Sequence, residues 1–253
     1  MLAYRSGIFP MADRRDDPEI FWIEPRQRAI LPLDGFHLSR SLARTLRRGR
    51  FTVTCNAAFP DVMDACAAPR ATEDGQSWIS HRIQRSYEQL NALGLAHSIE
   101  CWQAGADGSR ELVGGLYGVG FDGVFCGESM FWRVPDASKI ALAWLVAALR
   151  RGHAALLDCQ FLTPHLASLG AVEMPQQRYL ALLQSAQSWV AAGSASGDAA
   201  ATGDTAAEGE DEGAGAGVLS LPDAFAALLD DAASAGLSSS PGYFIAQSLT
   251  QTS

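Results

Sequence analysis

The stretch ELVGGLYGVGFDGVFCGESMFWRVPDASKIALAWLVAALRRGHAALLDCQ, from Glu111 to Gln160, decides the fold. Two apolar runs, Leu112–Phe121 and Val124–Phe131, are predicted to form strands. A helix is predicted from Ser138 to Arg151, ended by the glycine that follows, and a further strand from Ala154 to Phe161. Because a strand, a crossover helix and a strand give parallel pairing, we expect the polar residues at the strand ends to meet in one cleft.

Three polar side chains in this stretch are candidates for chemistry. Glu128 lies among apolar or small residues, so its carboxylate must point into a cleft or find a partner. Asp158 and Gln160 are two residues apart in a strand and therefore share one face of the sheet. The alternative interpretation is that both carboxylates are edge or capping groups satisfied by backbone amides, and single residues do not decide between the two.

Composition bounds the class of protein. With 253 residues and 48% hydrophobic content, the chain can bury one large core, or one core and a small satellite domain. We expect a cytoplasmic protein without a membrane partner, because no apolar run approaches membrane-spanning length and no signal-peptide core is visible. The five cysteines form no CxxC pair, which favours buried free thiols over a zinc site.

The net charge of −9 is distributed unevenly along the chain. Nine acidic residues and no lysine or arginine follow Tyr179, so the part before it is neutral. Almost all basic residues are arginines, which suits bidentate phosphate contacts, although genomic composition is an equal explanation. The negative total therefore does not exclude a nucleic-acid partner.

Short motifs follow one another along the chain: YRSGIFP, FHLSRSL, SWIS, LAHSIECW, GGLYGV, FCGESMF, DASK at a helix start, DCQF and HLASLGAVEM. In order and spacing they resemble the leucyl/phenylalanyl-tRNA–protein transferase family over roughly residues 2 to 183, and so many ordered motifs make the resemblance specific. The resemblance implies an enzyme that moves Leu or Phe, with Met as a third candidate donor residue, from tRNA onto the N-terminal Arg or Lys of a protein. Proteins marked in this way enter the N-degron route of degradation.

The resemblance also implies an acetyltransferase-like (GNAT-like) mixed sheet, of α+β or α/β class. We expect a monomer, although the sequence does not decide the oligomeric state. We expect a small N-terminal domain at residues 1–30 and a catalytic domain at 31–190. Family members carry an upstream segment that is absent here, so the N-terminal domain is expected to be shortened. Residues 191–217 are almost wholly small or acidic and are predicted to be a flexible linker. The C-terminal segment 218–253 is predicted to contain an amphipathic helix over Leu219–Ala235, and its last residues, 243–253, are predicted to dock back on the body. The apolar face of this helix is predicted to contain Leu221, Phe225, Leu228 and Leu229.

In the terms of the family, Asp158 and Gln160 correspond to a proposed proton-relay pair, and Glu128 to an acid that orients Gln160 or an amino group. Trp78 matches a tryptophan that stacks on the terminal adenosine of tRNA, whereas Met11 stands where many relatives have a second tryptophan. The implied aminoacyl pocket consists of apolar residues and one glycine, for which ordinary core packing is the alternative: Leu116, Phe125, Gly127, Met130, Leu145 and Leu157.

Residues His37–Arg50 are predicted to form an amphipathic helix with Leu38, Leu42 and Leu46 facing the core. Arginines repeat on another face of this helix: Arg40, Arg44, Arg47 and Arg48. They are candidates to bind the phosphates of the tRNA acceptor stem. A solvated charged face is the alternative. Elsewhere, Trp22 is expected in the core and His97 is expected to be a hydrogen-bonded structural histidine.

An aminoacyl-tRNA ester is already activated, and an α-amine has an unperturbed pKa of ~7.7–8.0. Orientation and a route for the proton are therefore sufficient, so we expect no metal, no cofactor and no covalent nucleophile. A coenzyme-A-dependent acyltransferase of the same fold would need a glycine-rich loop before the crossover helix, and the loop WRVPDASK contains no glycine. The other alternative is a non-catalytic tRNA-binding protein, which would have no need of Glu128, Asp158 and Gln160 together.

Overall fold

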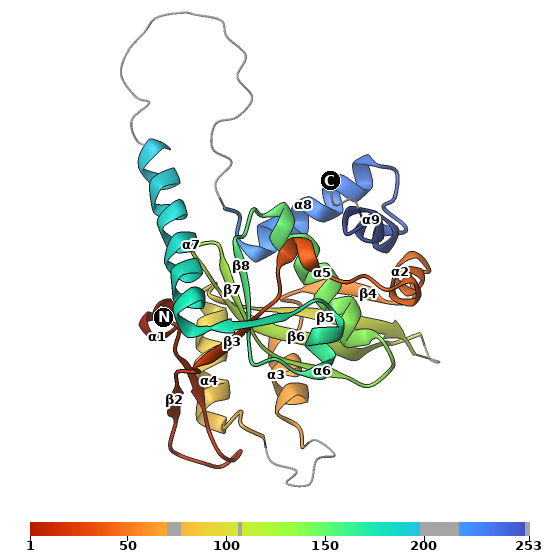
Figure 1. Cartoon of the computed structure of the whole chain (residues 1–253). Helices are drawn as coiled ribbons and strands as arrows, with labels where there is room; N and C mark the ends of the chain where they lie inside the picture. The colour runs from red at the N-terminus through yellow and green to blue at the C-terminus, as the bar shows by residue number, and fades with distance from the viewer. Residues whose placement is uncertain (70–76, 106–107, 198–217, 251–253) are drawn as a thin grey trace, which may run out of the picture.

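The computed structural model describes residues 1–69, 77–105, 108–197 and 218–250. A seven-stranded mixed sheet in the order β4-β5-β6-β7-β8-β3-β9 lies at its centre (Figure 1). Its strands are β3 (Gln27–Ile30), β4 (Thr52–Cys55), β5 (Ala96–Ala104), β6 (Arg110–Phe121), β7 (Val124–Trp132), β8 (Leu156–Gln160) and β9 (Val172–Pro175). A separate two-stranded sheet joins β1 (Phe9–Met11) to β2 (Phe21–Ile23).

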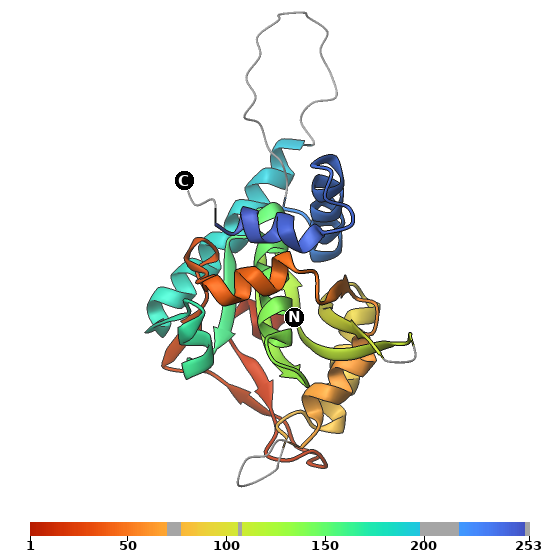
Figure 2. The same ribbon diagram turned by 90° about the vertical axis from the view of Figure 1, so that its right-hand side faces the viewer.

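Helices cover both faces of the large sheet. They are α1 (Leu2–Arg5), α2 (Arg40–Arg47), α3 (Phe59–Ala67), α4 (His81–Ala92), α5 (Ala137–Arg151), α6 (Pro164–Ser168), α7 (Gln176–Gly197), α8 (Leu221–Ser234) and α9 (Pro241–Ser248), with a 3₁₀ turn, η1, at Leu33–Gly35. One apolar cluster joins α2, α5, α8 and α9 to one face, and a second joins α1, α3, α4 and α7 to the other (Figures 1 and 2). The chain therefore has the predicted mixed α/β character.

The central stretch folds as predicted. Strands β6 and β7 form a hairpin whose two loop residues, Asp122 and Gly123, both have positive φ, as a tight two-residue turn requires. Helix α5 is buried almost all round, because the sheet lies on one side and the C-terminal helices lie on the other. Strands β7 and β8 pair in parallel, so the predicted strand, crossover helix and strand are confirmed.

The parallel pairing of β7 with β8 is short. It joins Val124–Cys126 to Leu156–Asp158, although β7 continues to Trp132. Beyond these three pairs the two strands diverge, and β3 pairs with β8 on its other side. The sheet is thus open at its centre, at the ends of β7 and β8 that carry the candidate polar residues.

Several predictions of detail were wrong. The helix predicted over His37–Arg50 is the shorter α2, capped by the Ser39 hydroxyl, so Leu38 precedes it. Trp22 is 61% exposed and does not enter the core, because it lies in the separate two-stranded sheet and not in the large one. Helix α7 continues through the first residues of the predicted linker to Gly197, and the remainder of that linker lies outside the described residues.

The C-terminal segment packs on the body through two helices, α8 and α9. In α8, the Phe225 ring packs on Trp144 of α5 with ring centroids 5.3 Å apart, and Asp231 forms an ion pair with Arg151. Leu229, which the sequence pattern placed on the same apolar face, is 39% exposed. The next helix, α9, packs against α2 and α5. In the described part of the chain, no helix is long and apolar enough to span a bilayer.

Because α8 completes the core over α5, we predict that Phe225→Ala destabilises the protein by about 3–5 kcal/mol through lost burial and a cavity against Trp144. Leu229→Ala on the same helix is the matched control and should cost less than about 1 kcal/mol. Denaturant unfolding of both variants measures the difference. Equal stabilities would mean that α8 contributes nothing to the core.

Candidate active site

A cavity of about 460 Å³ lies where β7 and β8 diverge. Nine of the residues singled out in the sequence line it: Met11, Trp78, Leu116, Gly127, Glu128, Met130, Leu145, Leu157 and Gln160. They come from β1, β6, β7, α5, β8 and the segment before α4, which the fold brings together around the opening in the sheet. The wall also contains residues that were not foreseen, among them Tyr117, Ser129, Trp132, Leu142 and Cys159.

Two predicted residues do not line this cavity. Phe125 is 1% exposed and its ring lies against Gly118 of β6, where even a methyl group would collide with it. Asp158 is completely buried and faces away from the cavity, toward Arg28 and Tyr179. Arg40, Arg44 and Arg47 of α2, and Arg48 directly after it, lie at a different cavity, between α2 and α9.

Glu128 is buried at the centre of a hydrogen-bond cluster. The hydroxyls of Tyr4 and Tyr87 donate to its two carboxylate oxygens, each at 2.8 Å, and the Gln160 side-chain amide donates at 3.1 Å. The two tyrosine oxygens are also 2.5 Å apart. Burial raises the pKa of Glu128 to about 7, against the opposing effect of the two tyrosine hydroxyls.

The proton count in this cluster fits a carboxyl group that titrates near neutrality. The three oxygen-to-oxygen contacts among Tyr4, Tyr87 and Glu128 need three protons, and the two phenols supply only two. A proton on Glu128 supplies the third, in which case one tyrosine accepts from the carboxyl group and donates to the other tyrosine. Burial also raises the pKa of both tyrosines, so neither phenol gives up its proton in the ordinary pH range.

Asp158 is held by four donors. The Arg28 guanidinium donates to both of its oxygens, the Tyr179 hydroxyl donates at 3.1 Å, and the Gln160 backbone N–H donates at 2.9 Å. Arg28 also donates to the Gly7 carbonyl at 3.0 Å. Both members of the ion pair are at most 1% exposed, so it is fully shielded from water.

Gln160 is fixed at both its backbone and its side chain. Its φ of +58° is in the left-handed region, which a residue with a Cβ adopts at a cost of roughly 1–2 kcal/mol. The bond from its N–H to Asp158 and the bond from its amide to Glu128 hold this conformation. Its side-chain carbonyl oxygen accepts no hydrogen bond from the described residues, so it is available to a ligand in the cavity.

Aromatic and sulfur groups line other parts of the cavity. Trp78 and Met11 lie on neighbouring segments, since the Ala12 N–H donates to the Trp78 carbonyl at 3.1 Å. Trp132 stacks on His165 with ring centroids 6.2 Å apart and is 61% exposed. The Nε2 atom of His165 is buried without a partner among the described residues, and burial lowers the pKa of this histidine.

Tyr4, Tyr87 and Arg28 are functional candidates that the sequence pattern did not reveal. Tyr4 is in a four-residue helix at the N-terminus and Tyr87 is in an ordinary amphipathic helix, 83 residues away. A tyrosine on an apolar helix face gives no signal that its hydroxyl will meet a carboxylate. Arg28 gives a weak signal, because it is a charged residue that directly precedes the apolar run Ala29–Leu31.

Other candidate positions have structural roles. The His97 Nδ1 is 3.0 Å from the Asn56 amide, so the predicted structural histidine is confirmed, and burial lowers its pKa. All five cysteines are free thiols, three of them fully buried. Within the described ranges, no cluster of three or more His, Cys, Asp or Glu side chains is arranged to hold a metal ion.

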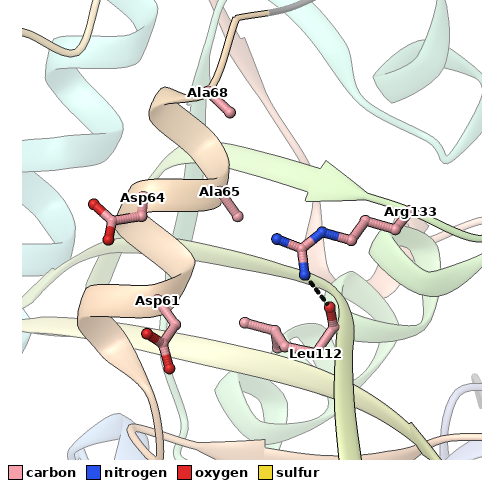
Figure 3. A pocket seen from close by; sticks show the side chains of 6 residues that line it. All are labelled: Asp61, Asp64, Ala65, Ala68, Leu112 and Arg133. Carbon is pink, nitrogen blue, oxygen red and sulfur yellow. Dashed lines mark hydrogen bonds between the residues drawn. The ribbon is translucent and has the colours of Figure 1, made fainter. Parts of the chain in front are cut away.

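A second cavity, of about 410 Å³, lies between α3 and the end of β7 (Figure 3). Asp61 and Asp64 line it from α3. Arg133 donates to the Leu112 carbonyl at 2.7 Å instead of meeting either carboxylate. This cavity contains none of the groups that converge on Glu128.

The sequence matches two family models. One, described as leucyl/phenylalanyl-tRNA protein transferase, matches residues 30–184, and the other, described as the N-terminal domain of the same protein, matches residues 1–26. A solved structure described as L-PGS from Bacillus licheniformis is 15% identical, with a TM-score of 0.32, over 66% of this chain and 54% of that chain. That likeness is too slight to support an argument.

Curated relatives carry the name leucyl/phenylalanyl-tRNA–protein transferase. The protein from Novosphingobium aromaticivorans is 64% identical over 256 residues, which covers 99% of this chain and 94% of the relative. The protein from Zymomonas mobilis is 56% identical over 74% of this chain and 67% of its own length. The one from Rhizorhabdus wittichii is 53% identical over 77% of this chain and 76% of its own length. The chain therefore belongs to the leucyl/phenylalanyl-tRNA protein transferase family.

Proposed function

We propose that this chain transfers Leu or Phe from aminoacyl-tRNA to the N-terminus of acceptor proteins. One observation supports this above all: a single cavity combines an apolar wall with Glu128 and Gln160 on one side and with Trp78 and Met11 on another. An aminoacyl ester of adenosine has the same three parts, an apolar side chain, a reacting carbonyl and a nucleobase. We further propose that the acceptor begins with Arg or Lys, that Met is a third donor residue, and that the product is marked for degradation.

The fold that carries this function is proposed to be acetyltransferase-like, acting as a monomer in the cytoplasm. The divergence of β7 and β8 beyond Cys126 supports the proposal, because it opens the sheet between two central strands for a substrate. The crossover helix α5 starts directly from the loop that contains Asp136, and this loop has no glycine. This argues against a bound pyrophosphate and hence against coenzyme A as the donor.

The aminoacyl side chain is proposed to lie in the apolar wall. Leu116, Leu145 and Leu157 are buried there, whereas Met130 and Gly127 are half-buried and border the open space. A flexible thioether such as Met130 adapts to both a branched and an aromatic side chain. Phe125 is buried in the core and does not line the cavity. We therefore propose that it packs behind the wall, and not that it contacts the aminoacyl side chain as predicted.

The reaction forms a C–N bond between the acceptor amine and the aminoacyl carbonyl and breaks the ester C–O bond to the tRNA ribose. We propose that the Gln160 carbonyl oxygen accepts a hydrogen bond from the attacking amine and orients its lone pair. Glu128, with a pKa of about 7, accepts the proton that the amine loses and returns it to the departing ribose oxygen. Proton transfer of this kind contributes roughly 10²–10⁴-fold.

Asp158 is proposed to be a positioning residue. Its two oxygens are occupied by four donors, so it cannot accept a proton without breaking the ion pair with Arg28. Through the Gln160 backbone N–H it holds that residue in the left-handed conformation that directs the amide to Glu128. We therefore propose that Asp158 acts by fixing the conformation of Gln160, and not as a member of the predicted proton relay.

The tRNA is proposed to bind through its terminal adenosine and its phosphates. Trp78 offers a ring face to the adenine, which is worth ~1–3 kcal/mol per stacked base, while Met11 supplies a softer contact. The arginines at positions 40, 44, 47 and 48 are exposed and are proposed to contact the acceptor stem.

The first experiment supplies the purified chain with labelled Phe-tRNA or Leu-tRNA and a model protein that begins with Arg, beside a control that begins with Ala. We expect label on the Arg acceptor alone, because the activated ester needs only an oriented amine. Binding of tRNA without any transfer would instead support the alternative of a non-catalytic tRNA-binding protein.

We predict that Gln160→Ala and Asp158→Ala lower kcat by roughly 10²-fold, because the amine is no longer oriented, with the dissociation constant for tRNA nearly unchanged. Asp158→Ala should also destabilise the protein by about 3–5 kcal/mol, since Arg28 is left buried without its partner. Single-turnover kinetics and tRNA binding are measured below the melting temperature of each variant. A parallel loss of rate and binding would refute the assigned roles.

The pH dependence isolates Glu128. In the wild-type protein the rate should rise with pH through about 7, as Glu128 loses its proton, and again through the amine pKa of ~7.7–8.0, so that the logarithm of the rate has a slope near two below pH 7. In Glu128→Gln the rate should be lower by roughly 10²-fold, and only the rise with pH that follows the amine pKa should remain. Tyr87→Phe removes a hydroxyl that lowers the pKa of Glu128. In this variant the rise of the rate that follows the Glu128 pKa should therefore occur at higher pH. A slope of two in Glu128→Gln would exclude this residue as the proton acceptor.

A further inference from the structure

Two aromatic rings at the mouth of the catalytic cavity have no part in the reaction described above. Trp132 is the last residue of β7, and His165 lies in α6, the short helix that follows β8. Their rings are stacked at an angle of 20°, with centroids 6.2 Å apart, and both residues line the catalytic cavity. Because β7 and β8 diverge beyond Cys126, this pair of rings joins the two sides of the opening in the sheet.

The position of Trp132 on β7 directs it toward the cavity. Side chains two residues apart on a strand share a face, so Trp132 lies on the same face as Met130, which also lines the cavity. The next residue, Arg133, lines the second cavity beside α3 instead (Figure 3). A ligand group that contacts Met130 and extends toward the end of β7 therefore reaches Trp132.

Trp132 is exposed although it lies beside the core. On β6 its partner is Gly114, and a Cβ at this glycine would collide with the Cβ of Ala137 in α5. Helix α5 therefore packs directly on β6 at this pair, and the Trp132 indole is 61% exposed at the mouth of the cavity. An exposed indole gains free energy when an apolar group covers it.

His165 holds the indole in a defined orientation. The Thr163 hydroxyl accepts a hydrogen bond from the Leu166 N–H at 3.2 Å and so caps α6, which fixes the place of His165 in the first turn. Burial, and next the positive charge of Lys139, lower the pKa of His165, so its ring is neutral at pH 7. Stacking of two neutral rings orients the indole before any ligand enters the cavity.

The surroundings of this pair favour an uncharged aromatic ligand. The wall that continues from it into the cavity is aliphatic, with Leu116 and Leu145 both buried. The charge of Lys139, which acts on His165, would repel the cationic side chain of an N-terminal Arg or Lys. The phenyl ring of a Phe donor is uncharged, and it gains an aromatic contact with the indole that a Leu side chain cannot make.

We propose that Trp132, with His165 as its positioning residue, forms the outer wall of the aminoacyl pocket and favours Phe over Leu as the donor residue. The inference rests on the proposed function and adds a determinant of donor specificity to it. In this complex the phenyl ring lies between Met130 and the indole, whereas a Leu side chain contacts Met130 alone. The two rings bind the donor and take no part in the transfer of the proton.

The test measures the binding of two inert donor analogues, in which phenylalanine or leucine is joined by an amide bond to 3′-amino-3′-deoxyadenosine. Calorimetry gives the ratio of the leucyl to the phenylalanyl dissociation constant. Trp132→Ala should lower this ratio about two- to tenfold, as expected for the loss of one aromatic pair, and Trp132→Phe should keep most of it. Trp22→Ala is the matched control, because Trp22 is also 61% exposed but does not line the cavity, and it should leave the ratio unchanged.

The positioning role of His165 is tested with the same two analogues. His165→Ala should also lower the ratio, because the indole is no longer held in place, and His165→Phe should restore it, because a stacked ring returns. A ratio that stayed low in His165→Phe would overturn the positioning role. The melting temperature of each variant is measured beside the binding, so that loss of folding is recognised.

Two results in Trp132→Ala would overturn the inference. An equal loss of affinity for both analogues would mean that the indole binds a part that they share, such as the ribose. An unchanged ratio with a raised KM for the Arg acceptor would assign the indole to the acceptor. In the transfer assay, the preference in kcat/KM for Phe-tRNA over Leu-tRNA should fall by the same factor as the binding ratio. If the wild-type chain transferred neither residue, the proposed function would fail, while the dissociation constants would still test the pocket.

Discussion

The ion pair between Arg28 and Asp158 is the constraint on which the rest of the site depends. It joins β3 to β8 inside the protein, and Arg28 also binds the Gly7 carbonyl and lies between the rings of Phe9 and Tyr179. The N-terminal segment, the sheet and α7 are thereby connected through one guanidinium group. Such a pair is costly to bury, and the loss of one partner typically costs about 3–5 kcal/mol. The same Asp158 carboxylate also accepts a hydrogen bond from the Gln160 backbone N–H. The ion pair therefore also fixes the backbone conformation of the residue that reaches the cavity.

The opening in the sheet follows from the same constraint. Because Asp158 is turned toward Arg28 on β3, strand β8 is drawn to β3, and its pairing with β7 ends at Cys126. Glu128, two residues farther along β7, then has no neighbouring strand on that side and finds its partners in Tyr4, Tyr87 and Gln160. The cavity is thus not a defect of packing but the result of polar groups on two diverging strands that each have a partner elsewhere.

The sequence predicted the central part of this arrangement and missed its periphery, for a physical reason. The apolar runs and the crossover helix around Glu128 are local signals, and period and length are enough to place them. The two tyrosine partners of Glu128 come from α1 and α4, and no local pattern predicts which group a tyrosine hydroxyl will contact. Trp22 was misplaced because its strand looks like any apolar strand, and its exposure depends on what covers it. The ends of α2 were set by the Ser39 cap and not by the longer leucine period.

The two carboxylates of the site show how environment divides their roles. Both are buried, and burial penalises a charged carboxylate unless a positive group compensates for it. Asp158 has a guanidinium on both oxygens and accepts from the Gln160 backbone N–H, so it shapes the backbone. Glu128 has only neutral donors, so burial raises its pKa to about 7, where a proton can be taken up and released at little cost. A single buried arginine therefore decides which acid holds the structure and which one is free to exchange a proton with the substrate.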